Sequence, residues 1–342
     1  MAVPAAHEKK TQKKHMSVPA LIAVHLLCIG LGLIVFAYFH HVRDYYAPAP
    51  AQFAPVSLIT PSPVPSPTAE PAVSEGPEAT PRAEEVREDR GAFYDRFPEK
   101  FTDGEIIRTD DTYISKNINV TVTKVQQPEL VYHVAEIYIS DMRYLRSAFG
   151  EKGYGSRGMA ADLASANDAV TAISGDYYSA RKEGIVIRNG VLYRETLFED
   201  ICVLLSDGRM ITLNSREIDM DELKHAAPWQ VWSFGPALLL DGEALTEIHS
   251  TVARNNPRSA IGYAEPGHYF FVQVDGRGAY GSRGMTLQEL ARLFEELGCQ
   301  TAYNLDGGQT AGFVWNGELQ SYPYGRSVSD IIYITDQPAE ED

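Results

Sequence analysis

The chain has few of the residues that would point to a metal or nucleotide site. It has only three cysteines in 342 residues, and neither a Cys-x-x-Cys pair nor a His-Glu-x-x-His motif, so nothing is typical of zinc binding. Its glycine-rich stretches lack the Gly-Lys-Ser/Thr ending of a phosphate-binding P-loop. Basic residues are also scarce, with 30 Lys and Arg against 46 Asp and Glu, and the formal net charge of −16 argues against nucleic-acid binding.

The cysteines give little information about pairing. Cys28 lies in a long apolar run, and Cys202 and Cys299 each have apolar neighbours, which is typical of buried free thiols. A disulfide between Cys202 and Cys299 is the alternative, because we expect this part of the chain to be outside the cell, where disulfides form.

The N-terminal part reads as a membrane anchor. Residues 1–17 form a basic tail with four lysines, and residues 18–40 contain no Asp, Glu, Lys or Arg, which predicts a transmembrane helix. Because the lysines precede the apolar run, we expect a single-pass protein of the cell membrane, with its N-terminus inside and its C-terminal domain extracellular. A cleaved signal peptide is the alternative, but the run is longer than a usual signal sequence.

Residues 41–92 have the composition of a linker. The first half is rich in proline, alanine and serine and the second half is acidic, so neither can bury a core. We expect a spacer between the membrane and a globular domain over 93–342.

This domain is expected to be α+β, with mixed or antiparallel sheets and two or three packed helices. Many apolar or alternating segments of strand length are joined by turns such as Arg188-Asn189-Gly190, and clear helical patterns are few. The expected strands are 118–125, 131–140, 169–173, 184–188, 202–205, 210–213, 231–234, 237–240, 269–274, 301–303, 312–315 and 331–335. The expected helices are 159–167, 219–226 and 286–297.

The segment from Met285 to Thr310 carries the strongest local pattern. Thr286 and Glu289 have capping-box spacing before an apolar helical stripe, and a short strand then leads to Asn304-Leu305-Asp306-Gly307-Gly308. A carboxylate followed by two glycines at a strand end suits a substrate site, although an ordinary Asp-Gly turn is the alternative.

A repeat strengthens the interpretation as a site. Tyr-Gly-Ser-Arg-Gly-Met occurs at 154–159 and again at 280–285, and each copy precedes a helical pattern, a strand and an aspartate beside glycine. The alternatives are a recurring structural turn or chance. We favour the hypothesis that two similar units bring Asp176 and Asp306 to one cleft.

Seven short motifs follow one another along the chain: 172–178 (AISGDYY), 234–238 (FGPAL) followed by Asp241-Gly242, 256–262 (NPRSAIG), 274–277 (VDGR), 282–286 (SRGMT), 304–308 (NLDGG) and 326–330 (RSVSD). In this order they resemble the phosphodiester glycosidase domain family, which includes a lysosomal enzyme and bacterial envelope proteins. The resemblance covers roughly Tyr113 to Thr335. The chain departs from the family in two places: Ser174 replaces the usual Asn, and Gln309-Thr310 replaces a third glycine and a serine.

The resemblance implies a hydrolase that cleaves a sugar-1-phosphodiester, or a related glycosidic bond, in envelope or exopolysaccharide glycans. The departures leave open a non-catalytic glycan-binding or scaffold module of the same fold. Cleavage of a phosphorus–oxygen bond is a third alternative.

Glycosidic cleavage needs two carboxyl groups about 5–10 Å apart, and Asp306 and Asp176 are the expected catalytic pair. Arg258 is the leading candidate for the phosphate because its planar fork matches an oxyanion. The other expected substrate-binding residues are Asn304, Gly307, Gly308, Thr310, Gly175, Tyr178 and Arg326. Arg157 and Arg283 of the repeat are more simply read as surface ion pairs.

No cofactor is required by the sequence. A divalent cation, Ca²⁺ or Mg²⁺, is a minority hypothesis where Asp176, Asp306 and Asn304 converge, because such ions prefer hard oxygen ligands. The expected partners are a glycan or sugar-phosphate substrate and the membrane.

Overall fold

A computed structural model of the chain describes residues 51–52, 90–214 and 218–337. The predicted basic tail, the predicted membrane helix and most of the predicted linker lie outside the described residues, so they stay predictions. Within the described ranges, no helix has both the length and the apolar character needed to cross a membrane.

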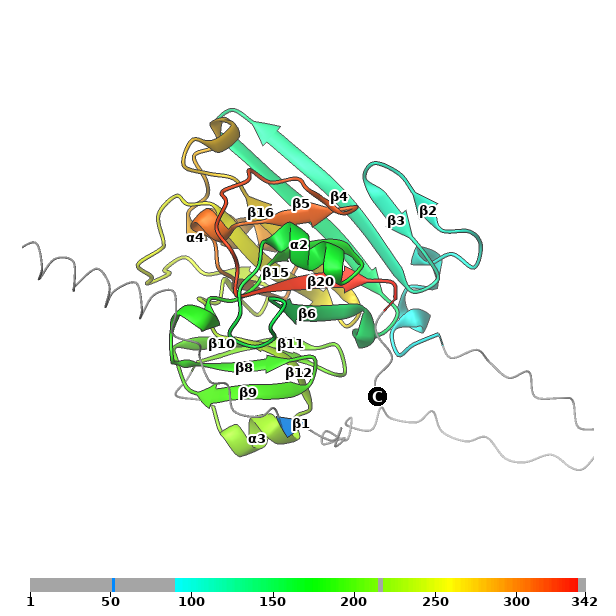
Figure 1. Cartoon of the computed structure of the whole chain (residues 1–342), viewed down its shortest axis with the longest axis horizontal. Coiled ribbons are helices and arrows are strands. Elements are labelled where there is room, and N and C mark those ends of the chain that lie inside the picture. Colours follow the sequence, from blue (N-terminus) through cyan, green and yellow to red (C-terminus); the bar gives the residue numbers. More distant parts are fainter. Residues whose placement is uncertain (1–50, 53–89, 215–217, 338–342) are drawn as a thin grey trace, which may run out of the picture. The chain divides into compact units, whose positions relative to one another are not determined.

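The largest sheet has seven strands, and the long hairpin of β4 and β5 dominates it (Figure 1). Side chains of β4 alternate between buried and partly exposed along its first half, as expected for a strand with one face on a core. In spatial order the strands are β17 (Thr301–Asn304), β15 (Arg258–Glu265), β16 (His268–Val274), β5 (Leu130–Ile139), β4 (Ile118–Gln127), β3 (Thr112–Ile114) and β2 (Ile107–Arg108).

Two further sheets and a short hairpin complete the domain. The five-stranded sheet has the order β19 (Glu318–Leu319), β18 (Phe313–Trp315), β7 (Ala169–Ser174), β20 (Asp330–Thr335) and β6 (Leu145–Phe149). The six-stranded sheet has the order β1 (Ala51–Gln52), β9 (Val191–Thr196), β8 (Gly184–Arg188), β12 (Pro228–Trp232), β10 (Asp200–Leu205) and β11 (Met210–Asn214). The hairpin consists of β13 (Leu239–Leu240) and β14 (Glu243–Ala244).

One core lies where the three sheets meet, and each sheet carries one helix on another face. Ile137 and Phe271 of the seven-stranded sheet, Phe313 of the five-stranded sheet and Leu204 and Trp232 of the six-stranded sheet belong to one buried cluster. Separate clusters join α2 (Ala160–Ala166), α3 (Met220–His225) and α4 (Leu287–Glu296) to the five-, six- and seven-stranded sheets, respectively.

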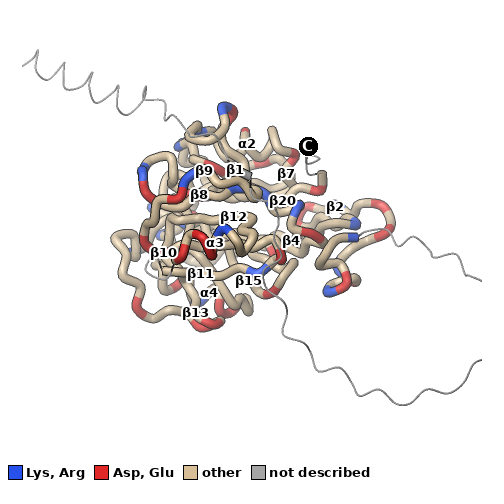
Figure 2. Tube along the Cα trace, turned by 90° about the horizontal axis from the view of Figure 1, so that it is seen from below, with Lys and Arg blue, Asp and Glu red and all other residues tan. Residues whose placement is uncertain are grey.

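Local capping explains where two of these helices begin. The Asp219 side chain accepts hydrogen bonds from Asp221 N (2.8 Å) and Glu222 N (3.2 Å), and the acidic first turn of α3 is visible in Figure 2. At α4, Thr286 Oγ1 accepts from Glu289 N (3.1 Å) while Glu289 Oε2 accepts from Thr286 N (2.8 Å). The predicted capping box is therefore confirmed.

The expected class is confirmed in its antiparallel, strand-rich form with three helices among the described residues. Every strand pair assigned within the described ranges is antiparallel, so the parallel component of a mixed sheet is absent there. The sequence did not predict strands β1, β2, β3, β6, β9, β14, β15 and β19, and the other helices and strands lie within a few residues of their predicted positions. Cys202 and Cys299 are both buried free thiols.

The capping box gives a stability prediction. Thr286→Ala should lower the free energy of unfolding by about 1 kcal/mol, because Glu289 N loses its acceptor at the start of α4. Urea denaturation should show a lower midpoint with an unchanged slope. Thr196→Ala, at an exposed position on β9, is the control and should leave the midpoint unchanged; equal shifts in both variants would contradict the prediction.

Candidate active site

Asp306 lies where three backbone segments pack closely, and the glycine that follows it makes this packing possible. Asp306 N donates to Gly175 O (2.9 Å), and the preceding Leu305 N donates to Ser259 O (2.8 Å). A Cβ on Gly307 would lie 2.5 Å from Pro257 O, so a larger residue would force the segments apart. The Asp306 side chain is consequently held near the surface with only 7% of the residue exposed.

The environment of Asp306 suits proton transfer. Burial raises the pKa of Asp306 to about 7, and the nearby Asp176 charge acts in the same direction. The Thr310 side chain and the guanidinium groups of Arg326 and Arg157 act the other way. A carboxyl with this pKa changes its protonation state near neutrality, which is the property of an effective general acid or base.

Asp176 is held differently, because protein groups occupy both of its carboxylate oxygens. Oδ1 accepts from Tyr177 N (2.6 Å) and Arg181 Nη2 (3.2 Å). Oδ2 accepts from Ser233 N (2.8 Å) and lies 3.5 Å from Arg188 Nη2. The residue has no exposed surface. Asp176 is therefore close to Asp306 but does not line an open cleft, unlike the expected pair of facing carboxyls.

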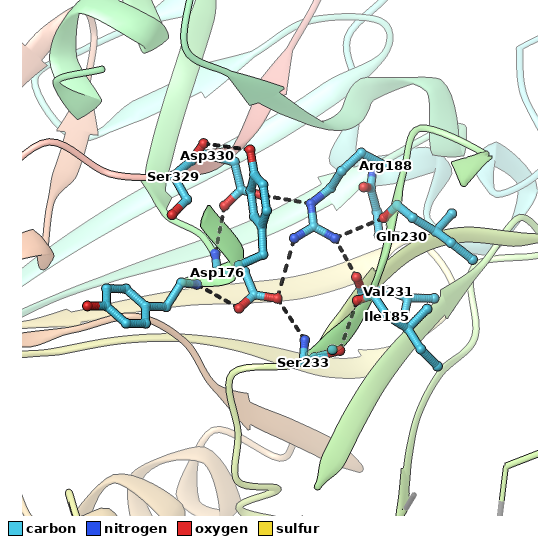
Figure 3. Close-up of polar contacts among 12 residues, drawn as sticks. Asp176, Ile185, Arg188, Gln230, Val231, Ser233, Ser329 and Asp330 are labelled. Carbon is cyan, nitrogen blue, oxygen red and sulfur yellow. Dashed lines mark hydrogen bonds and ion pairs between the residues drawn. The ribbon is translucent and has the colours of Figure 1, made fainter. Parts of the chain in front are cut away.

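A buried guanidinium joins Asp176 to a third carboxylate. Arg188 Nε donates to Asp330 Oδ2 (2.6 Å), and the same guanidinium pairs with Asp176 (Figure 3). Asp330 Oδ1 accepts from Asp176 N (2.7 Å). The same oxygen would lie only 2.3 Å from a Cβ at position 175, so the site requires glycine there. Burial raises the pKa of Asp330 to about 6 although Arg188 opposes this.

The repeated hexapeptide belongs to two units of matching topology. The first copy joins β6 to α2 and β7, and β20 lies between these two strands. The second copy joins β16 to α4 and β17, and β15 lies between those strands. Each unit ends in an aspartate, and Asp306 N bonds Gly175 O, so the units meet at their aspartate ends.

Arg157 and Arg326 lie beside Asp306 without a carboxylate partner in the part of the chain that the structure describes. Arg157 Nε donates to Ser179 Oγ (2.8 Å), and Arg326 Nη2 donates to Tyr177 Oη (3.1 Å). Both residues are exposed, and both act electrostatically on Asp306. Arg157 was expected to form a surface ion pair; its counterpart Arg283 does, with Glu289 at 2.7 Å.

Arg277 is a third cation near this site, and in the sequence it stood out only as part of the motif 274–277. Its Nη2 lies 3.1 Å from where a Cβ of Gly308 would be, and it donates to Asn256 Oδ1 (3.2 Å). Tyr324 Oη accepts from Gly276 N (2.8 Å), which ties the Arg277 loop to the loop that carries Arg326. Arg277 has a positive φ (58°), a backbone conformation that the sequence does not predict for an arginine.

Arg258, the expected phosphate ligand, is directed into the fold. Its Nε donates to Met285 O (3.0 Å) and its Nη2 donates to Val252 O (2.7 Å) and Arg254 O (2.5 Å). The residue is 2% exposed, and burial lowers its pKa to about 10. The guanidinium thus holds three carbonyls together, and it has no accessible fork beside Asp306.

Other expected ligands also have internal partners. Tyr178 is buried, stacks on Tyr154 with ring centroids 5.0 Å apart, and donates to Ser329 O (3.2 Å). Its neighbour Tyr177 is the half-buried tyrosine beside Arg326. Asn304 Nδ2 donates to Gly235 O (2.8 Å), while Asn304 Oδ1 has no partner.

Thr310 and Ser174 shape the turn after Asp306. Thr310 Oγ1 donates to Gly307 O (2.6 Å), and Ser174 Oγ donates to Thr310 O and accepts from Gly312 N (2.9 Å). The serine that departs from the family pattern therefore anchors this turn to β7.

The described residues contain no group of three or more His, Cys, Asp or Glu side chains placed to hold a metal ion. Both oxygens of Asp176 are already bonded, so the hypothetical cation would have Asp306 and Asn304 Oδ1 as its available ligands. That cation stays a prediction.

Comparison with known proteins shows which family the domain is similar to. Residues 167–335 match the phosphodiester glycosidase family, which confirms the resemblance inferred from the motifs. N-acetylglucosamine-1-phosphodiester alpha-N-acetylglucosaminidases from human and mouse are 41% and 39% identical over 66 residues, or 19% of this chain. An uncharacterised prophage-derived protein of Bacillus subtilis is 31% identical over 180 residues, or 50% of this chain.

The matches cover only part of these relatives. The chain spans 27% of the Bacillus protein and 12% of the human and mouse enzymes. The catalytic domain of the zebrafish enzyme of the same name, solved in a form auto-inhibited by its pro-peptide, has the same fold. It aligns with a TM-score of 0.53 and 21% identity over 70% of this chain and 86% of that domain.

The buried cluster of Arg188, Asp176 and Asp330 predicts that removing Arg188 lowers stability by an amount that depends on pH. Arg188→Gln should lower the free energy of unfolding by about 3–5 kcal/mol at pH 8, because the buried Asp330 carboxylate loses its cation and Asp176 keeps only Arg181 among the described residues. The folded-state pKa of Asp330 already exceeds its ordinary value, so its protonated form is favoured in the fold, and losing Arg188 raises that pKa further. The deficit should therefore shrink as pH falls from 8 to 5.

Urea denaturation at several pH values measures this effect. Arg209→Gln, which breaks the exposed Arg209–Asp207 pair, is the control and should cost less than about 1 kcal/mol. A deficit for Arg188→Gln that is small at pH 8, or that grows toward pH 5, would contradict the assignment.

Proposed function

We propose that this chain, whose residues 167–335 form a phosphodiester glycosidase domain, hydrolyses the bond between the anomeric carbon of a sugar and a phosphodiester. The observation that carries the proposal is the combination at Asp306. A nearly buried carboxyl with a raised pKa lies beside arginines that have no carboxylate partner among the described residues.

Arg157, Arg326 and Arg277 bind the phosphate in this proposal. Guanidinium groups match phosphate oxygens, and exposed arginines without protein counter-ions are free to accept an anion. Gly307 lets the Asp306 loop pack against Pro257 O, and Gly308 leaves room for the Arg277 guanidinium beside this loop. Arg258 supports the neighbouring backbone from the interior through its hydrogen bonds to three carbonyl groups.

Asp306 acts as the ionised carboxylate that activates water or attacks the anomeric carbon. Cleavage of the bond between the anomeric carbon and the phosphate oxygen releases a phosphate monoester, which is a stable anion, so the reaction does not depend on a general acid. Substrate phosphate adjacent to Asp306 would raise the pKa of Asp306, and the arginines compensate for that effect.

Asp176 is a positioning residue in this mechanism. Its carboxylate is fixed by Arg188, Arg181 and Ser233 N, so it holds the Gly175 backbone against Asp306 N. Its fixed negative charge also favours the positive charge that develops on the sugar ring in an oxocarbenium-like transition state.

The proposed setting is the outer face of the cell membrane. The apolar run 18–40 would anchor the protein, and the linker 41–92 would give the domain reach toward envelope or exopolysaccharide glycans. These parts of the proposal are supported by the sequence.

A non-catalytic glycan-binding module is the second candidate. The departures at Ser174 and Gln309 motivate it, but Ser174 keeps a defined role by anchoring the turn at Thr310. Measured turnover separates the two candidates directly.

Asp306→Asn should abolish release of sugar from an α-N-acetylglucosamine-1-phosphodiester, with a loss of at least about a thousandfold in kcat, because the amide cannot ionise. Circular dichroism should show an intact fold. Retention of full turnover would contradict the role of Asp306.

The pH profile of the wild-type enzyme is the companion measurement. Because the ionised carboxylate is the active form, kcat/KM should rise with pH through an apparent pKa near 7. A profile that falls through this pKa would assign Asp306 as an acid instead.

The two copies of the hexapeptide provide a test variant, at Arg157, and a matched control, at Arg283, for the proposed phosphate site. Arg157→Gln should raise KM by about ten- to a hundredfold, the cost of a lost charge-assisted hydrogen bond. Arg283→Gln occupies the equivalent position but pairs with Glu289, so KM should stay unchanged. Steady-state kinetics on the same substrate measure both, and equal effects would contradict the assignment of Arg157.

A further inference from the structure

A groove of about 330 Å³ lies outside the Asp306 site and has no assigned role. The 110–111 turn, strand β4 and Trp315 of β18 form its walls, and His133 of β5 also lines it. Trp315 Nε1 donates to Asp110 O (2.7 Å), which ties two of the walls together. None of the residues that line the groove takes part in the mechanism proposed above.

His133 is held rigidly at this groove. It is 2% exposed, and its ring stacks on Phe313 with centroids 5.2 Å apart and an interplanar angle of 12°. In the sheet His133 pairs with Lys124 on β4 and with Gln273 on β16. The imidazole therefore has a polar neighbour on each side.

The hydrogen bonds assign the tautomer of this imidazole. Asp275 Oδ1 accepts from Tyr322 N (3.0 Å) and from Gln273 Nε2 (3.0 Å), which orients the Gln273 amide. Gln273 Oε1 consequently faces His133 Nδ1 at 3.0 Å, and an acceptor there requires that Nδ1 carries the proton. Burial also lowers the pKa of His133, so the ring is neutral at neutral pH.

The other ring nitrogen is left as an acceptor without a donor. His133 Nε2 has no hydrogen-bond partner, although an unpaired buried acceptor costs about 1–3 kcal/mol. Because Nδ1 faces Gln273 on β16, Nε2 is directed to the opposite side of the ring. That side faces β4, which supplies Val122, Thr123 and Lys124 to the groove.

We propose that this groove is a second binding site, for one saccharide unit, in which a sugar hydroxyl donates its hydrogen bond to His133 Nε2. Sugar hydroxyls both donate and accept, which matches the mixture of Asp110, Asp111, Lys124 and Gln320 around the groove. The Lys124 ammonium disfavours a metal cation at the same place. The site is independent of the hydrolytic activity proposed above.

Histidine-selective ¹⁵N labelling of the intact chain tests this site with N-acetylglucosamine and glucose as probes. One imidazole should show a protonated Nδ1 and a bare Nε2 at neutral pH. His133→Phe, which keeps the stack on Phe313, identifies this signal by its disappearance. In the wild type, the Nε2 signal should move on saccharide addition and saturate at millimolar concentrations.

A second variant keeps the test valid if His133→Phe does not fold. Lys124→Gln alters only the exposed rim, so it should keep the tautomer and weaken saccharide binding several-fold. Three results would overturn the proposal: a proton on Nε2, no movement of this signal with either saccharide, or tighter binding of Zn²⁺ than of sugar. Turnover of substrate is not used as a readout, so failure of the hydrolytic proposal would leave this test unaffected.

Discussion

The site depends on the Arg188 guanidinium, buried between the carboxylates of Asp176 and Asp330. Two like charges in a low-dielectric interior repel each other, and a cation placed between them offsets this repulsion. The cation sets the position of Asp330, whose oxygen fills the space beside Gly175 and receives the Asp176 backbone N–H. Gly175 O in turn accepts from Asp306 N, so the position of Asp306 follows from a contact in the interior.

Local signals in the sequence predicted much of this arrangement. The capping box at Thr286 and Glu289, the apolar stripe of α4 and the strand before Asp306 depend on residues close in the chain, and all three are present. The hexapeptide repeat indicated two equivalent units, because matching local sequence adopts matching local structure. Strand β15 was missed because it is buried on both faces and shows no alternation between apolar and polar residues.

The residues that sequence reasoning misjudged are those whose roles depend on distant partners. Arg258 and Arg157 are both arginines beside small residues in short motifs. Three carbonyls enclose Arg258, whereas Arg157 stays exposed beside Asp306. Tyr177 and Tyr178 are adjacent in sequence, and the backbone turn after Asp176 sends only Tyr178 into the interior. Side-chain direction after a turn is not encoded in residue type or spacing.

The order of strands has a consequence for biosynthesis. Strand β20 lies between β6 and β7, which the ribosome produces more than 150 residues earlier in the chain. Arg326, Asp330 and β20 therefore reach their places only after nearly the whole domain has been synthesised. Until then Arg188 and Asp176 lack the partner that closes their cluster, so a nascent or prematurely terminated polypeptide has no assembled centre.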